Sequence, residues 1–286
     1  MAKTVRSLVV LGDSTTVGVG DPVPGGWRGV GPLLAAALPH ARYLNASVTG
    51  ARVASVRYGQ LPRVLPERPD AAVLLVGMND ALRSDFDPRR LHVDLDAVVG
   101  ALVAAGSTVV TVRFHDHSRV FRLPGALGRA LRARIAELSG VVDAVVRRHG
   151  VECVDLDLVE GAYSAGTWAV DRLHPSEAGH RLLAAAFAER LARAGCEVPG
   201  EVSPVCTGGI RVTPLHHVAW LVVKGIPWLW RRGGDLLPHA AAIVYRSWTG
   251  RPEPARHTTD PGLDRAGTGV VAASTTAPAG WRQRRS

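Results

Sequence analysis

The feature that most constrains the fold of this chain is a five-fold alternation of short apolar runs and longer stretches with helical spacing. The run 71–76 contains no polar residue, as in a parallel strand that is covered on both faces. Such alternation predicts an α/β fold, a three-layer α/β/α sandwich around a five-stranded parallel sheet with right-handed crossovers. The expected strands are 6–11, 42–45, 71–76, 108–114 and 151–156, and the expected helices are 27–38, 53–65, 88–105, 126–149 and 175–194.

The first apolar run ends in Gly12-Asp13-Ser14-Thr15. Ligands bind at the carboxyl ends of the strands in open α/β sheets, so Ser14 is well placed for a nucleophile. Its hydroxyl needs a base, because a serine is a weak nucleophile until its proton is accepted. The alternative is that Ser14 caps the next helix. We expect Asp13 to hydrogen-bond the loop backbone and to take no part in chemistry.

A base with its own orienting acid lies far downstream, at Asp171 and His174. A carboxylate three residues before a histidine can fix its tautomer and stabilise its cation. We expect His174 at the start of the last helix, where the helix dipole opposes a positive imidazole and the carboxylate offsets that effect. The alternative is that Asp171 caps a loop and His174 is a surface residue.

Two further strands are expected to end in residues that could donate hydrogen bonds, Gly50 and Asn79. Glycine lets a peptide N–H approach a substrate with no side chain in the way, and an amide side chain donates without carrying a charge. The alternatives are a plain turn at Gly50 and a helix cap at Asn79 or Asp80. Because the expected strands are parallel, all these segments should gather at one edge of the sheet.

The chain resembles the SGNH hydrolase superfamily, also called GDSL esterases and lipases, over roughly residues 5–195. The resemblance rests on the order and spacing of four blocks, which are Gly12-Asp13-Ser14-Thr15, Gly50, Gly77-Met78-Asn79-Asp80 and Asp171-Arg172-Leu173-His174-Pro175. Thr15 stands where the family usually has leucine, a position with no expected chemical role. The resemblance implies a flavodoxin-like SGNH hydrolase fold and a serine hydrolase that cleaves carboxylic esters through an acyl-enzyme.

The same resemblance implies the role of each residue. Ser14 is the nucleophile, His174 the general base and then the general acid, and Asp171 the residue that orients the imidazole. The oxyanion hole consists of the backbone N–H groups of Ser14 and Gly50 and the side-chain amide of Asn79. No cofactor and no metal are implied. Thioester hydrolysis or acyl transfer to an alcohol would use the same triad and stay open as alternatives.

Other constellations fit the sequence less well. The nucleophile segment lacks the second glycine of the α/β-hydrolase elbow. The group His115, Asp116 and His117 has no partner cluster nearby, so we assign it to the pocket rim rather than to a metal. The glycines between 18 and 26 do not precede the Gly-Lys-Ser/Thr of a phosphate loop. Short connecting loops with no evident lid favour a small or exposed acyl group.

The composition changes after residue 200, and we divide the chain into a catalytic domain (1–200), a Trp-rich amphipathic helical extension (201–248) and a disordered basic tail (249–286). By count, residues 201–286 hold 11 Lys and Arg against 5 Asp and Glu, so they carry +6 of the net charge of +9. Five of the seven tryptophans also lie there.

A basic, Trp-rich extension favours peripheral contact with an anionic membrane through 201–248, and binding through this region alone is an alternative function. Packing across the catalytic domain is the other interpretation. We expect no specific nucleic-acid partner and assign no oligomeric state. Neither a signal peptide nor an apolar run of about 20 residues is evident, and the three cysteines are odd in number, so we expect a cytoplasmic protein.

Overall fold

A five-stranded parallel sheet forms the centre of the computed structural model, which describes residues 2–121, 123, 125–208 and 245. The strands lie in the order β5–β2–β6–β7–β8, and every neighbouring pair is parallel. This is the flavodoxin-like order of doubly wound sheets. Their bounds are β2 Ser7–Gly12, β5 Arg42–Asn45, β6 Ala71–Leu75, β7 Thr108–Arg113 and β8 Glu152–Asp155. Each lies within one or two residues of its predicted range.

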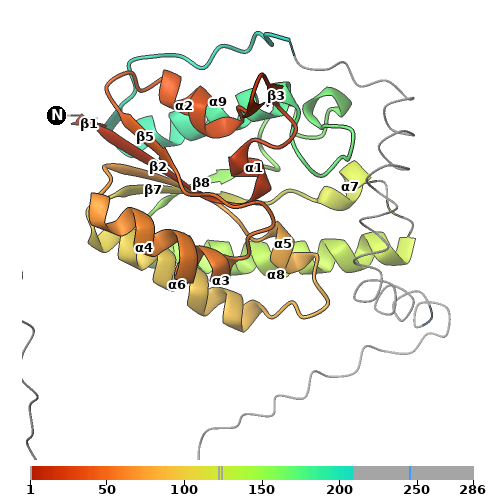
Figure 1. Cartoon of the computed structure of the whole chain (residues 1–286). Coiled ribbons are helices and arrows are strands. Elements are labelled where there is room, and N and C mark those ends of the chain that lie inside the picture. Colours follow the sequence, from red (N-terminus) through yellow and green to blue (C-terminus); the bar gives the residue numbers. More distant parts are fainter. Residues whose placement is uncertain (1, 122, 124, 209–244, 246–286) are drawn as a thin grey trace, which may run out of the picture. The chain divides into compact units, whose positions relative to one another are not determined.

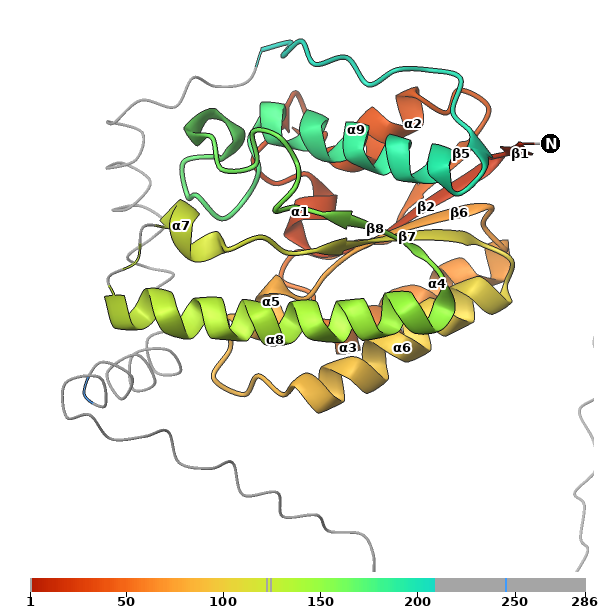
Figure 2. The ribbon, with the colours of Figure 1, turned by 180° about the vertical axis from the view of Figure 1, so that it is seen from behind.

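Helices cover both faces of the sheet, which confirms the predicted three layers (Figures 1 and 2). Helices α2 and α9 pack together on one face, and α6 and α8 pack together on the other, where α3 also contacts α6. The bounds of the four main helices are α2 Val30–Ala36, α6 Pro88–Ala104, α8 Gly125–His149 and α9 Glu177–Arg193.

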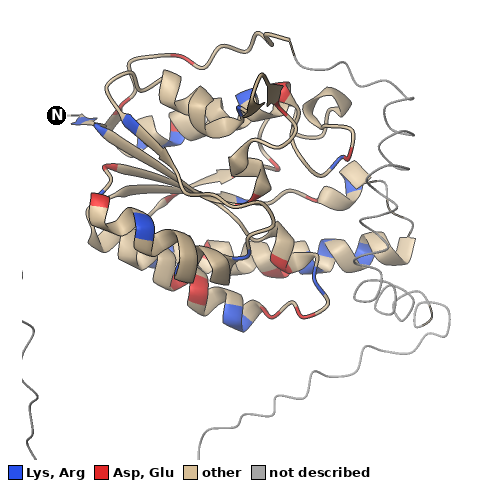
Figure 3. Cartoon of the chain, in the orientation of Figure 1, with Lys and Arg blue, Asp and Glu red and all other residues tan. Residues whose placement is uncertain are grey.

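The central strand β6 and its neighbour β2 carry no charged side chain, and charges lie mainly on the loops and helices around them (Figure 3). Every residue of β6 is buried. A strand covered on both faces has no solvent side, so a continuous apolar run stabilises it better than an alternating one. The core built on these strands fixes the sheet edge from which the polar turns project.

Helix α2 starts three residues later than predicted, because the buried carboxylate of Asp21 holds the preceding residues in a loop. It accepts hydrogen bonds from the Arg28 guanidinium at 2.9 and 3.0 Å and from the Gly29 N–H at 3.2 Å. The predicted start at Trp27 was therefore wrong. Trp27 instead belongs to a two-strand hairpin, β3 (Pro22–Val23) with β4 (Gly26–Trp27).

The predicted helix over 53–65 is broken into short pieces by the inward turn of Gln60. Its Oε1 accepts the Gly12 N–H at 2.9 Å, and its Nε2 donates to the Gly12 carbonyl at 2.7 Å. A π-helical turn adds one residue per turn and so redirects a side chain, often near a functional site. The pieces are α3 Val53–Ser55, the π-helix η1 Val56–Gln60, α4 Leu61–Val64 and the 3-10 helix η2 Leu65–Glu67.

Helix α9 begins at Glu177 rather than at Pro175. Ser176 is the N-cap residue, and its hydroxyl accepts the Gly179 N–H at 3.3 Å. Pro175 instead forms an isolated bridge with Trp168. His174 therefore lies before the helix, and the prediction that it starts the helix was wrong.

Several short elements had no predictable periodicity because they contain so few residues. Strand β1 pairs in parallel with β9, which ties the N-terminal end to the chain beyond α9. The short helices mostly follow strand ends. The bounds are β1 Lys3–Thr4, β9 Cys196–Glu197, α1 Ser14–Val17, α5 Met78–Ala81, α7 His117–Phe121 and the 3-10 helix η3 Ala165–Thr167.

Residues 201–208 lie against the start of α9. The buried Glu177 carboxylate accepts the N–H groups of Thr207 at 2.7 Å and Gly208 at 3.3 Å, and Arg181 donates to the Ser203 carbonyl at 2.7 Å. Cys206, within this segment, is exposed. Apart from residue 245, the remainder of the predicted extension and the predicted tail lie outside the described residues.

Among the helices that the structure describes, none combines the length and the apolar character needed to cross a lipid bilayer.

Replacing Gln60 by leucine should destabilise the protein without altering its surface. Gln60→Leu leaves the buried N–H of Gly12 without its partner, which costs about 1–3 kcal/mol, while the Gly12 carbonyl keeps the bond from the Val48 N–H at 3.2 Å. We therefore expect the free energy of unfolding in urea to fall by about 1–3 kcal/mol. Arg63→Leu, at an exposed position of α4, is the control and should change it by less than about 0.5 kcal/mol. Equal unfolding midpoints for the two variants would contradict the role of Gln60.

Candidate active site

Polar side chains project from the carboxyl ends of three neighbouring strands of the sheet. Asp13 and Ser14 follow β2, Asn79 lies in α5 just after β6, and His115 follows β7. The loop that holds His174 reaches the same edge from beyond β8 and contacts Ser14 there. This is the edge where ligands bind in open α/β sheets.

Ser14 is the first residue of α1, and it is Asp13 that caps this helix. The Asp13 Oδ1 accepts the Thr15 N–H at 3.0 Å. The cap interpretation of Ser14 was therefore wrong, and the expected bond of Asp13 to the loop backbone is confirmed. Gly12 must be a glycine, since a Cβ there would lie 2.1 Å from the Leu75 carbonyl oxygen. This close crossing lets the chain turn sharply from β2 into α1.

Ser14, His174 and Asp171 form a continuous chain of hydrogen bonds. The Ser14 Oγ lies 2.7 Å from the His174 Nε2, and the His174 Nδ1 lies 2.6 Å from the Asp171 Oδ2. An ionised carboxylate can only accept, so Nδ1 carries the proton and the Nε2 lone pair faces the serine hydroxyl. Chemically, such a chain of groups can supply a nucleophile, a base and a residue that orients the base.

The second oxygen of Asp171 organises the turn that presents His174. Its Oδ1 accepts the backbone N–H groups of Leu173 and His174, both at 2.9 Å. Burial opposes ionisation of this carboxyl, but the bond and charge of His174 and the two N–H groups outweigh it. Its pKa therefore lies below the ordinary value of an aspartate. Asp171 is thus anionic at neutral pH and can stabilise a positive imidazole.

The two backbone N–H groups that the sequence predicts for an oxyanion hole, those of Ser14 and Gly50, have no hydrogen-bond partner among the described residues. The Ser14 N–H is the first of its helix, and the Gly50 N–H lies in an exposed turn with φ of 78°. The Asn79 amide is differently placed. Its Nδ2 donates to the Asp13 Oδ2 and to the Ala51 carbonyl, each at 3.1 Å. To bind a developing oxyanion, the Nδ2 would donate to the oxyanion beside one of these two acceptors or in place of it.

Neither Asn79 nor Asp80 caps the helix to which it belongs, α5. Gly77 precedes α5 at the cap position, and no side-chain cap bond is made there. The Asp80 carboxylate instead accepts the Val53 N–H at 3.1 Å and lies 3.2 Å from the Arg52 Nε. Asp80 thereby ties α5 to the start of α3, next to the loop that holds Gly50.

Asp13 is a buried carboxyl at the centre of this network. Burial raises its pKa to about 6, although the Thr15 N–H and the charge of His174 act in the opposite direction. The carboxyl therefore titrates in the range where many enzymes are assayed. Protonation would leave the Asn79 amide beside a neutral group instead of a carboxylate.

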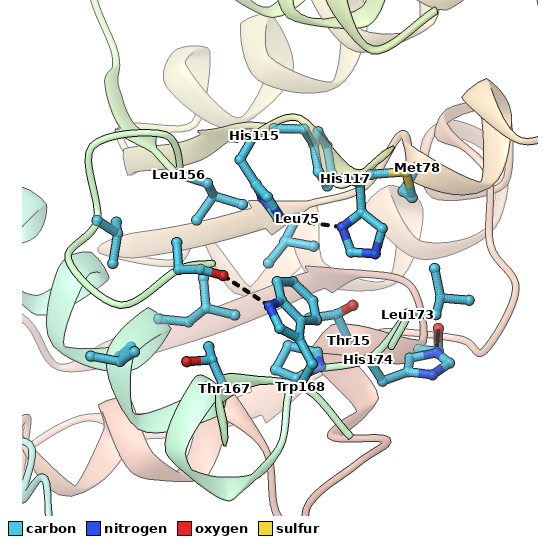
Figure 4. A pocket seen from close by; sticks show the side chains of 18 of the residues that line it. Thr15, Leu75, Met78, His115, His117, Leu156, Thr167, Trp168, Leu173 and His174 are labelled. Carbon is cyan, nitrogen blue, oxygen red and sulfur yellow. Dashed lines mark hydrogen bonds between the residues drawn. The ribbon is translucent and has the colours of Figure 1, made fainter. Parts of the chain in front are cut away.

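A pocket of about 60 Å³ opens beside Ser14 and His174. Figure 4 shows the rings of His115 and His117 joined by a hydrogen bond, with Trp168 close to both. The Trp168 indole N–H donates to the Ala162 carbonyl at 2.8 Å, which fixes this wall. Most other lining side chains are apolar, including Leu75, Met78, Phe114, Leu156, Val159, Leu182 and Leu183.

The group at 115–117 forms part of the pocket wall rather than only its rim. His115 and His117 are buried, and their rings lie 5.0 Å apart between centroids. Asp116 turns away to Ser118 and Arg132. Burial lowers the pKa of His115 to about 4 and that of His117 to about 3, so both are neutral at physiological pH. In the part of the chain that the structure describes, no group of three or more His, Cys, Asp or Glu side chains could hold a metal ion.

The sequence places Trp168 only at the end of an expected rim segment, 160–168, and does not single out Gln60 or the residues that brace the start of α9. Trp168 contributes to the pocket through a loop contact with Pro175, for which the sequence carries no periodic signal. The positions 115 and 117 were noticed, but their burial was not, because histidine alone does not indicate burial.

The model of the family described as "GDSL-like Lipase/Acylhydrolase family" matches residues 10–182. The chain belongs to the GDSL-like lipase/acylhydrolase family. It is accordingly an esterase of the GDSL type, which confirms the resemblance seen in the sequence. A comparison with curated proteins gives no match.

Solved structures share the fold of this chain. The crystal structure of TesA is 26% identical, covers 66% of this chain and 99% of its own, and superposes with a TM-score of 0.54. LAE5, an α/β hydrolase from the metagenome of Lake Arreo in Spain, is 24% identical over 67% and 97% of the two chains, with a TM-score of 0.55. The acetylxylan esterase Axe2 of Geobacillus stearothermophilus is 19% identical over 67% and 95%, with a TM-score of 0.54. At 24% and 19% identity, the similarities to LAE5 and Axe2 show a shared fold only.

The titration of Asp13 should make stability depend on pH. Its pKa is raised from 3.8 to about 6 on folding, so the stability that the neutral carboxyl contributes is fully present below pH 4 and is lost as the pH rises through 6. Asp13→Asn has no group that titrates at this position, so its stability does not fall for this reason. The difference in melting temperature, variant minus wild type, should therefore increase between pH 4 and 7 and stay constant above that. Asp87→Asn, at the N-cap of α6, is the control carboxylate. A difference for Asp13→Asn that is flat over this range would contradict the raised pKa.

Proposed function

We propose that this GDSL-type esterase hydrolyses carboxylic esters with short acyl groups through an acyl-enzyme on Ser14. The observation that carries the proposal is the hydrogen-bonded chain from Ser14 through His174 to Asp171, which opens on a small apolar pocket. The family supports the reaction type, and the assignment of the individual residues is ours.

The first step is attack of the Ser14 Oγ on the ester carbonyl. The His174 Nε2, 2.7 Å away, accepts the hydroxyl proton as the Oγ–carbon bond forms. The Nδ1 proton stays on His174, and the Asp171 carboxylate stabilises the resulting imidazolium through the 2.6 Å contact. The negative charge moves to the former carbonyl oxygen.

The oxyanion would be bound by the backbone N–H groups of Ser14 and Gly50 and by the Asn79 Nδ2. The free state of the two N–H groups supports this role, because donors that are fixed in place before the reaction need no reorganisation. Each such donor typically contributes a factor of about 10²–10³ in rate. Asn79 would join them if the oxyanion replaced one of the two acceptors to which its Nδ2 now donates, the Asp13 Oδ2 or the Ala51 carbonyl.

Collapse of the tetrahedral intermediate breaks the bond to the leaving alcohol, which takes the proton from the His174 Nε2. Water then attacks the acyl-enzyme while the His174 Nε2 accepts its proton, and His174 returns that proton to the Ser14 Oγ as the bond to the acyl carbon breaks and the carboxylic acid leaves. The same base thus serves both halves of the reaction, and no cofactor enters the proposal.

The pocket volume supports a short acyl group. A cavity of about 150 Å³ holds a benzene molecule, and the pocket beside Ser14 has about 60 Å³. Its apolar walls suit an acyl chain of few carbons. A longer chain would leave most of its methylenes in water, and each unburied CH₂ forgoes about 0.8 kcal/mol.

Hydrolysis of p-nitrophenyl esters from acetate to palmitate tests the mechanism and the pocket together. We expect activity on acetate and butyrate, a fall of at least about tenfold toward palmitate, and a loss of at least about a thousandfold in Ser14→Ala. Fluorophosphonate should label the wild type and not this variant. Thr4→Ala, at an exposed hydroxyl of β1, is the control and should keep full activity. Equal rates for wild type and Ser14→Ala would reject the proposal.

We propose a domain division into a catalytic unit and a C-terminal segment that contacts anionic membranes. The bonds of Thr207, Gly208 and Ser203 to the start of α9 favour a boundary after residue 208 for experiments. The charge of +6 and the tryptophans beyond residue 200 support the membrane contact.

Flotation with liposomes tests this second function. The full chain should float with phosphatidylserine liposomes at low salt and release at high salt, because the attraction is electrostatic. A chain that ends at residue 208 should stay at the bottom of the gradient while retaining esterase activity. A full chain that ignores anionic liposomes at low salt would exclude the membrane contact and leave the esterase proposal untouched.

A further inference from the structure

His117 is a buried side chain beside the site for which the proposed mechanism has no use. It is the first residue of α7 and is 2% exposed. Its ring packs edge-on against two aromatic rings, with a centroid distance of 4.7 Å to Trp168 and of 4.5 Å to Phe121. Packing therefore fixes its position on two sides. Figure 4 shows it in the pocket wall, with Leu173 and His174 nearby.

The polar contacts of His117 define its protonation. Its Nε2 lies 2.8 Å from the Arg172 carbonyl oxygen, and its Nδ1 lies 3.2 Å from the His115 Nε2. A carbonyl can only accept, so the His117 Nε2 carries the proton. The ring is neutral, so Nδ1 has no proton and accepts a hydrogen bond from the His115 Nε2–H. His115 thus holds His117 in the tautomer that donates to Arg172.

The carbonyl that His117 binds belongs to the turn that presents the proposed base. Arg172 lies between Asp171 and His174, and its φ of 55° is in the left-handed region, which is unfavourable for a residue with a side chain. Such a conformation persists only where surrounding contacts determine it. The turn is closed by further bonds, from the Arg172 N–H to the Ala169 carbonyl at 3.0 Å and from the Ala169 N–H to the His174 carbonyl at 2.9 Å.

We propose that His117 is a positioning residue for the catalytic base. It holds the Arg172 carbonyl and with it the left-handed turn that aims Asp171 and His174 at Ser14. The inference rests on the proposed function, because it concerns the orientation of the same base. His117 touches neither Ser14 nor the reacting atoms in this account, and it acts through the backbone of the turn.

Neutrality is part of the role. Burial, first, and the neighbouring His115 hold the pKa of His117 well below that of a free histidine, so no second positive charge competes with the imidazolium that forms on His174. The donor at this position is therefore an uncharged N–H, which an amide side chain can imitate.

The test compares His117→Gln with His117→Met. The two side chains have nearly the same length and volume, and only glutamine keeps an N–H that can reach the Arg172 carbonyl. On p-nitrophenyl acetate we expect His117→Met to lower kcat by about 10- to 100-fold, because a displacement of about 1 Å costs this much, with KM changed by less than about threefold. His117→Gln should recover at least half of that loss on a logarithmic scale.

Leu102→Ala is the control for destabilisation alone. Leu102 is fully buried in α6, away from the site, so its truncation should lower the melting temperature and leave kcat within about twofold at a temperature where the variant is folded. Equal kcat for the glutamine and methionine variants would overturn the proposal. So would an unchanged kcat in His117→Met.

A measurement on the wild type covers the case in which His117→Met does not fold. The imidazole ¹⁵N shifts of His117 should show a protonated Nε2 and an unprotonated Nδ1 at pH 7. The opposite tautomer would overturn the proposal, because Nε2 could then not donate to Arg172. Loss of activity in Ser14→Ala together with unchanged kcat in His117→Met would reject the positioning role and keep the proposed function.

Discussion

The two oxygens of the Asp171 carboxylate connect the backbone of this protein to its candidate chemistry. One oxygen accepts hydrogen bonds from two peptide N–H groups and thereby shapes the turn, and the other accepts a hydrogen bond from the His174 Nδ1–H. The position of the imidazole is therefore tied to the backbone by the same group that sets its charge. A carboxylate placed by its own turn keeps its distance to the imidazole that it binds, and the fold brings this turn to Ser14.

The fold was predictable because its signal is distributed over long apolar runs. Strand β6 and helices α6 and α8 each match their predicted ranges within one residue, since burial on both faces of the sheet leaves a continuous pattern. The start of α2 and the break at η1 were not predictable. Each depends on one buried polar side chain, Asp21 or Gln60, whose partner lies elsewhere in the chain. Periodicity carries no information about such a partner.

The same division holds for the site. The positions of Ser14, Asn79, Asp171 and His174 could be expected at one sheet edge, because parallel strands end together and the family motifs fall there. The two partners of the Asn79 amide could not, because Asp13 and Ala51 lie on loops far apart in the sequence, and their contact with Asn79 depends on how those loops pack. Pocket walls made by loops, such as Trp168, belong to the same class.

The segment 201–208 also offers a site for selective chemical labelling. Cys206 is exposed, Cys196 is buried, and Cys153 is half-buried with its thiol pKa raised to about 12, chiefly by burial. Thiolates react and protonated thiols do not, so a maleimide dye at neutral pH would attach to Cys206. A fluorophore on Cys206 would then lie next to Thr207, which donates a hydrogen bond to Glu177. Glu177 is only three residues after His174 in the chain. Its polarity response would report on the start of α9 without any engineered cysteine.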